Sequence, residues 1–144
     1  MNLQTVVMNV GDLNTSVAFY RDVLGFSELA MKDQLAAVYA AGNDRPQVIV
    51  FREITTSGRL EGARHLGMRA LVVEVDSIPE LDRVVAALEE RGLLVSRREG
   101  DVWLAAFGRD PDGTAVVAGV SKTATPITLQ SWADLDESLY GVGE

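Results

Sequence analysis

The chain contains no cysteine, and this absence excludes several kinds of chemistry. Disulfides, thiolate metal sites and a cysteine nucleophile are all excluded, because each of them needs a sulfur atom that the chain lacks. Histidine is almost as scarce, since only His65 is present. A single imidazole cannot build a metal site by itself. His65 is therefore interpreted as a solvated or hydrogen-bonded structural residue.

Long apolar runs and concentrations of positive charge are missing as well. No stretch approaches the roughly 20 consecutive apolar residues of a membrane-spanning helix, so no membrane partner is expected. The first residues lack the basic and apolar segments of a secretory signal, which predicts a cytoplasmic protein. The formal net charge is −8, and the 13 Lys and Arg residues are scattered apart from Arg97 and Arg98. This charge balance argues against a nucleic-acid partner.

The 144 residues have the length and composition of one ordinary globular domain. Their apolar periodicity predicts two successive modules, residues 1–54 and 68–121, joined by a polar connector at 55–67. In both modules the expected order is strand, helix and three strands. The expected strands are 3–10, 26–31, 35–41 and 47–54 in the first module, and 68–75, 93–97, 102–107 and 114–120 in the second. One domain spanning residues 1–121 is predicted, followed by an extension at 122–144 that contains a short helix.

Each expected helix has an apolar stripe and recognisable ends. The first helix is predicted to bury Leu13, Val17, Tyr20 and Leu24 and to end at Gly25. The second should start at Ser77 in a capping box with Glu80 and end at Gly92. Its buried stripe is predicted to comprise Leu81, Val84, Val85 and Leu88.

Residues 10–26, which read VGDLNTSVAFYRDVLGF, resemble the opening of the vicinal oxygen chelate superfamily. This superfamily includes glyoxalase I, bleomycin-resistance proteins, fosfomycin-modifying enzymes and extradiol dioxygenases. Residues 72–76 and the Asp110-Pro111-Asp112-Gly113 turn match its later motifs, so the resemblance covers roughly residues 3–120. It implies an α+β fold in which paired βαβββ modules form curled mixed sheets around a cavity, within one chain or across a homodimer. A homodimer is expected.

The resemblance also identifies where the family holds its metal ion. The corresponding positions are Thr5, Ala70 and Val117, with a less regular fourth position near Val50. One hydroxyl and three hydrocarbon side chains cannot coordinate a divalent ion in a defined geometry. No metal and no other cofactor are therefore predicted.

Strand alternation predicts which side chains face the cavity instead. A concave apolar surface with a few polar groups is typical of a small-molecule site. Trp103 shares a strand face with Ala105 and Phe107, but alternation alone does not say whether this face is the cavity or the core. The predicted ligand-binding residues are Thr5, Val7, Asn9, Tyr39, Val50, Arg52, Ala70, Val72, Glu74, Trp103 and Val117.

Two functions are compatible with these residues. The first is a binding protein of the bleomycin-resistance type, which sequesters an apolar or planar natural product, such as an antibiotic, in a dimer cavity. The alternative is a metal-independent isomerase, cyclase or lyase in which Glu74 is the catalytic general acid or base, because a carboxylate in an apolar cavity suits proton transfer. Glu74 could equally form a structural ion pair with Arg52 or Arg69. A domain that serves assembly alone is a third possibility.

Overall fold

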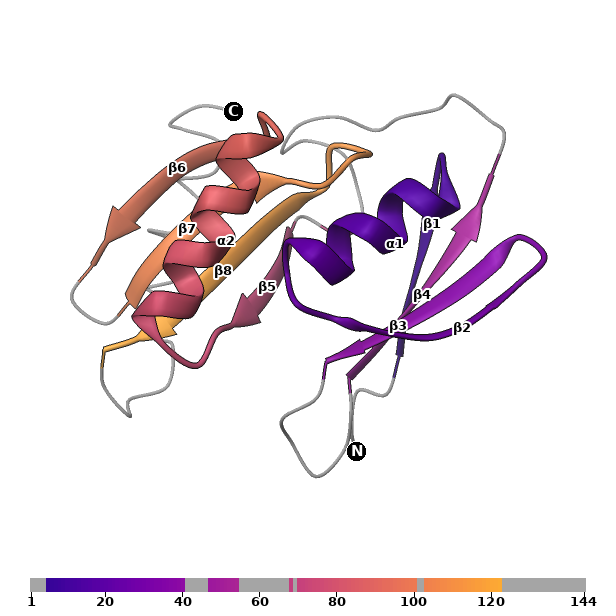
Figure 1. Cartoon of the computed structure of the whole chain (residues 1–144), viewed down its shortest axis with the longest axis horizontal. Helices are drawn as coiled ribbons and strands as arrows, with labels where there is room; N and C mark the ends of the chain where they lie inside the picture. Colours follow the sequence, from indigo (N-terminus) through magenta and orange to yellow (C-terminus); the bar gives the residue numbers. More distant parts are fainter. Residues whose placement is uncertain (1–4, 41–46, 55–67, 69, 101–102, 123–144) are drawn as a thin grey trace. The chain divides into compact units, whose positions relative to one another are not determined.

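The structure is a computed structural model that describes residues 5–40, 47–54, 68, 70–100 and 103–122 (Figure 1). The chain divides into two compact units, Met1–Arg59 and Leu60–Glu144. Among the described residues, each unit has one helix and one four-stranded mixed sheet. The predicted connector at 55–67 and the predicted helix of the C-terminal extension lie outside the described residues, and the grouping of both modules into one domain stays a prediction.

The first unit has the predicted order of strand, helix and three strands. Its sheet runs β1-β4-β3-β2, with β1 parallel to β4 and antiparallel pairing elsewhere. The elements are β1 (Thr5–Val10), α1 (Leu13–Asp22), β2 (Ser27–Lys32), β3 (Leu35–Ala40) and β4 (Gln47–Glu53).

The second unit repeats this topology, with the sheet order β5-β8-β7-β6 and β5 parallel to β8. The two units therefore confirm the predicted α+β fold of paired βαβββ modules, with element ends within a few residues of those expected. The elements are β5 (Ala70–Glu74), α2 (Ile78–Glu90), β6 (Leu94–Glu99), β7 (Trp103–Arg109) and β8 (Ala115–Ser121).

Side chains fix the first turn of α1 at two places. Asp12 accepts a hydrogen bond from the backbone N–H of Thr15 at 2.8 Å, and Glu53 of β4 accepts one from the N–H of Leu13 at 3.0 Å. These bonds satisfy N–H groups that have no partner within the helix. Accepting the backbone N–H of Thr15, and its side-chain hydroxyl as well, lowers the pKa of Asp12. The end of α1 is as predicted, because Gly25 has a positive φ of 78°.

The start of α2 is simpler. Ser77 accepts the N–H of Glu80 at 3.3 Å, which confirms the predicted N-cap. The Glu80 carboxylate, however, lies 2.9 Å from Arg83, so the pair makes a salt bridge along the helix in place of the reciprocal half of the capping box. Gly92 has a φ of 68° and follows the helix as expected.

In both units the predicted helix stripe is buried against the sheet. Tyr20 is fully buried in α1, and its ring centroid lies 5.3 Å from that of Phe19, 5.9 Å from that of Phe26 and 4.9 Å from that of Phe51. The core beneath α1 therefore contains an aromatic cluster. The stripe of α2 is aliphatic, and its buried members are Leu81, Val84, Val85 and Leu88.

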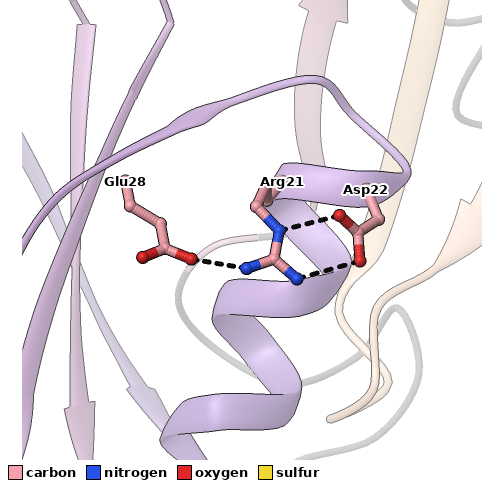
Figure 2. A network of polar contacts seen from close by, with 3 residues as sticks. All are labelled: Arg21, Asp22 and Glu28. Atoms are coloured by element: carbon pink, nitrogen blue, oxygen red, sulfur yellow. Dashed lines mark hydrogen bonds and ion pairs between the residues drawn. The ribbon is translucent and has the colours of Figure 1, made fainter.

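The edge strand β2 is attached to the end of α1 by a cluster of charges (Figure 2). Arg21 contacts Asp22 at 2.7 Å and Glu28 of β2 at 2.5 Å. The hydrogen bond to Asp22, followed by the one to Glu28, raises the pKa of Arg21 above its ordinary value. All three side chains are about half exposed, so these ion pairs contribute little to the stability of the fold.

Candidate functional site

Each sheet has one face covered by its helix and a second face that we call the helix-free face. In the first unit, the Tyr20 hydroxyl of α1 contacts the Met8 sulfur at 4.0 Å, so Met8 points to the helix. Alternation along β1 then places Thr5, Val7 and Asn9 on the helix-free face. Strand register adds Val50 and Arg52 of β4 and Tyr39 of β3 to the same face.

This first helix-free face is open within its unit. Val7 is 65% exposed and Leu35 of β3 is 47% exposed, while Asn9 and Arg52 are neighbours in register and are both exposed. The remaining predicted residues on this face, Thr5, Tyr39 and Val50, are partly buried. The structure therefore brings the first six predicted ligand-binding residues onto one mixed polar and apolar surface.

The second helix-free face is identified by Gly108 of β7. A Cβ atom built on Gly108 would lie 2.9 Å from Leu88 of α2, so this residue points to the helix. Its neighbour Phe107 points the other way, together with Ala105 and Trp103. In register with them on this face are Ala70, Val72 and Glu74 of β5 and Ala115, Val117 and Gly119 of β8.

The centre of this second face is tightly packed. Ala105, Phe107, Ala115 and Val117 are each no more than 2% exposed, and Ala70 and Val72 pack against them. Val117 is thus fully buried in a cluster, whereas Ala70 and Val72 keep part of their surface accessible. Accessible apolar surface is therefore found toward β5 and around Trp103.

Trp103 rests directly on a glycine of the neighbouring strand. A Cβ atom at Gly119 would lie 2.1 and 2.2 Å from two carbon atoms of the Trp103 indole, a distance that no side chain tolerates. Gly119 thus provides the space for the ring, as strand glycines do where another group approaches closely. The indole is only partly buried, although its Nε1 atom is buried and has no hydrogen-bond partner among the described residues. The ring is held by packing on the helix-free face.

Glu74 lies beside this ring. In the strand register, Glu74 of β5 pairs with Gly119 of β8. Gly119 also pairs with Ala105 of β7, and Ala105 pairs with Arg98 of β6. These four residues form one row across the sheet, and the indole covers the Gly119 position. Glu74 is exposed and makes no ion pair or hydrogen bond with any residue that the structure describes. Of its two expected partners, Arg52 belongs to the other unit and Arg69 lies outside the described residues.

Charged side chains on the helix side of the same sheet form ion pairs. Arg97 contacts Asp82 of α2 at 2.7 Å, and Lys122 contacts Glu99 at 2.5 Å. The hydrogen bond from Lys122 lowers the pKa of Glu99. Charges on the helix side therefore neutralise one another, whereas Glu74 on the helix-free face does not take part in such a pair within the described part of the chain.

The positions that correspond to the family's metal ligands do not suit a metal ion. Thr5, Val50, Ala70 and Val117 all lie on the helix-free faces, but they offer one hydroxyl oxygen and three hydrocarbon groups. A divalent ion needs several anionic or imidazole donors. Within the described residues no three Asp, Glu, His or Cys side chains gather into a possible metal site.

Alternation places Gly119 on this face, but its contact with Trp103 was not predicted, and Ser96 and Arg98 were not recognised as residues of the face. The contact could have been predicted, because a glycine inside an apolar strand often marks a close approach. Ser96 and Arg98 reach the face through the register of β6, which shifts at Val95. The hydroxyl of Ser96 is buried and has no hydrogen-bond partner among the described residues. No local sequence signal predicts that shift.

The family comparison agrees with this fold. Residues 2–117 match the family model of the Glyoxalase/Bleomycin resistance protein/Dioxygenase superfamily. No curated protein matches the chain. No helix in the described ranges is long and apolar enough to cross a membrane.

Several solved structures have a similar fold. A glyoxylase/bleomycin resistance protein/dioxygenase domain from Frankia sp. EAN1pec has a TM-score of 0.69 and 24% identity, covering 85% of this chain and 98% of its own. The fosfomycin resistance protein FosX from Listeria monocytogenes has a TM-score of 0.67 and 16% identity, covering 91% and 97%. Lactoylglutathione lyase from Agrobacterium tumefaciens has a TM-score of 0.59 and 21% identity, covering 83% and 92%. At these identities the structures support the fold alone, and it is the match over residues 2–117 that assigns the chain to the Glyoxalase/Bleomycin resistance protein/Dioxygenase superfamily.

Proposed function

We propose that this protein binds a planar, largely apolar small molecule and releases it unchanged, in the manner of a bleomycin-resistance protein. The observation that carries this proposal is the Trp103 indole resting on Gly119, next to the accessible parts of Ala70 and Val72. A bulkier residue at position 119 would fill this space. The chain instead presents a large aromatic surface where the resembled family has its small-molecule cavity.

The physical requirements of sequestration are modest. Buried apolar surface contributes roughly 25 cal/mol per Å², and stacked aromatic rings add about 0.5–1.5 kcal/mol. A planar ligand that covers the indole and the neighbouring aliphatic groups would gain both contributions. Turnover requires in addition a group placed at the reacting atom and a stronger interaction with the transition state.

The experiment uses tryptophan fluorescence. The chain contains two tryptophans, Trp103 and Trp132, so Trp132→Phe leaves Trp103 as the single reporter. Titrating this variant with planar natural products should give saturable quenching. Trp103→Phe should weaken binding and Trp103→Ala should weaken it further, as measured by calorimetry. Mass spectrometry should recover the compound unaltered. Equal affinity of Trp103→Ala and the parent protein would contradict the proposal.

The alternative function, a metal-independent isomerase, cyclase or lyase, is favoured by one observation. Glu74 presents an exposed carboxylate beside the indole, with no ion-pair partner among the described residues. If the recovered compound is rearranged, and Glu74→Gln abolishes this conversion while affinity is retained, then Glu74 is the general acid or base and the binding-only proposal is wrong.

The proposal includes assembly into a homodimer. Val7 and Leu35 leave apolar side chains exposed on the first helix-free face, and a second chain is one way to cover them. Sedimentation equilibrium at micromolar concentration should give the mass of a dimer. A monomer at this concentration would contradict this part of the proposal.

A further inference from the structure

The charge next to Trp103 indicates what kind of planar molecule the second helix-free face selects. We propose that the ligand is a planar aromatic cation, with its rings on the indole and its positive charge near the Glu74 carboxylate. This inference rests on the proposed binding function and specifies the ligand class.

The register places the two recognition groups side by side. Glu74 and Gly119 are direct partners on adjacent parallel strands, about 4.8 Å apart across the sheet. Because the indole covers Gly119, the carboxylate flanks the ring. An aromatic ring attracts a cation through its negative π-face, and a carboxylate attracts it by charge. Both groups therefore favour the same ligand charge.

Positive side chains on this face make no ion pair with Glu74 within the described part of the chain. Arg98 stands on the far strand of the row, two strand spacings or about 10 Å from Gly119 and three from Glu74. Arg109 is four residues along β7 from Ala105, about 13 Å at the usual rise per residue. Lys122 is occupied by Glu99. None of the described residues neutralises Glu74.

The net charge of −8 acts in the same direction, because it raises the local concentration of any cation near the protein. This effect is not specific to the site, so the experiment must separate it from the contribution of Glu74. Glu89 is a suitable control, since it is an exposed carboxylate on α2 and its neutralisation changes the net charge by the same amount.

Three planar three-ring probes of different charge test the inference: proflavine as the cation, acridone as the neutral compound and 9-anthracenecarboxylate as the anion. Dissociation constants are measured with the Trp132→Phe protein, and again with Glu74→Gln or Glu89→Gln added. In the parent, proflavine should bind about tenfold more tightly than acridone, and the anion should bind most weakly. Glu74→Gln should remove the preference for the cation by weakening proflavine binding about tenfold, a much larger change than its effect on acridone. Glu89→Gln should keep the preference.

The outcomes separate this inference from the function on which it rests. Saturable binding of all three probes with equal affinity would overturn the cation preference and leave the binding function standing. A preference that Glu89→Gln reduces as much as Glu74→Gln does would also overturn it, because net charge would then be its cause. No saturable binding of any probe, with Trp103 fluorescence unchanged throughout, would overturn both.

Discussion

The two units share one topology and differ in how far they bury the helix-free faces of their sheets. Matched through their registers, Val38 of the first sheet corresponds to Gly108 of the second on the helix side, and Ala37 corresponds to Phe107 on the helix-free side. The first unit thus has the larger side chain of this pair on the helix side, beneath α1, where Tyr20 packs against its aromatic neighbours. The second unit packs Phe107 away from its helix. One topology can therefore leave the helix-free face of its sheet open, as in the first unit, or bury the centre of that face, as in the second.

The same matching explains where the indole lies. Asn9 and Arg52 of the first unit correspond to Glu74 and Gly119 of the second. The first unit has an exposed arginine at the position where the second has no side chain and accommodates Trp103. The proposed binding surface therefore depends on one matched position, which holds the large charged side chain of Arg52 in the first unit and the glycine Gly119 in the second.

The largest expected effect comes from placing a carboxylate at matched positions of the two helix-free faces. Val117→Asp should unfold the second unit, because Val117 is fully buried and the effective penalty for burying an ion is several kcal/mol. Val50→Asp should be tolerated, since Val50 is partly exposed within its unit. Circular dichroism melts and soluble yield measure both. Equal destabilisation would show that the two faces are buried alike in solution.

Gly119→Ala should have the next largest effect. Its Cβ would overlap the indole, and overpacking of this kind usually costs about 1–3 kcal/mol. In a chain that already carries Trp103→Ala, the same Gly119→Ala change should cost little further stability, because the clash disappears with the ring. Urea unfolding of both single variants and the double variant gives the coupling energy. Additive effects of the two substitutions would mean that the ring does not rest on Gly119.

Gly108→Ala should destabilise the second unit more mildly. Its Cβ would lie 2.9 Å from one methyl carbon of Leu88 and 3.0 Å from both the other methyl carbon and the backbone oxygen of Leu93. The flexible Leu88 side chain can shift slightly, so about 1–2 kcal/mol is expected in urea unfolding. Gly100→Ala is the matched control, because its Cβ would meet its nearest neighbour at an ordinary 3.6 Å. A loss of similar size for Gly100→Ala would mean that the close contacts of position 108 with Leu88 and Leu93 are not the cause.

Much of this arrangement could be predicted from the sequence, because local rules control it. The spacing of Leu81, Val85 and Leu88 identified a helix face, and Gly25 and Gly92 occupy the left-handed positions expected after helices. Alternation also grouped the predicted ligand-binding residues by strand face and left the face of Trp103 open, and contacts such as that of Met8 with Tyr20 then identify which face lies away from the helix.

The rest depends on contacts between strands that are distant in the sequence. The position of Trp103 follows from its register with β8, and Arg98 reaches the helix-free face only because β6 shifts register at Val95. Similarly, Glu53 joins the start of α1 across 40 residues. The different burial of the two helix-free faces was not predicted either, because Val50 and Val117 are the same residue type in matched strands.

The smallest effect concerns how the two helices begin. Asp12 can lose its charge in acid and Ser77 cannot, so only the start of α1 should depend on pH through its cap. The hydrogen bonds from Thr15 lower the pKa of Asp12 below its ordinary value in the folded state. Its stabilising contribution is therefore present above the unfolded value and is lost as the pH falls through the lower folded value.

Asp12→Asn separates this contribution from the other acidic groups. Asparagine also caps helices well, so the variant should melt close to the parent protein at pH 7 and lose less stability as the pH falls from 5 to 2. The pKa values of Glu80 and Glu99 are also lowered, by hydrogen bonds from Arg83 and Lys122, but both residues are unchanged in the variant and cancel in the comparison. Thermal melts over this pH range should show the melting temperature of the variant rising above that of the parent toward acid, whereas parallel curves would mean that the Asp12 cap contributes nothing through its charge.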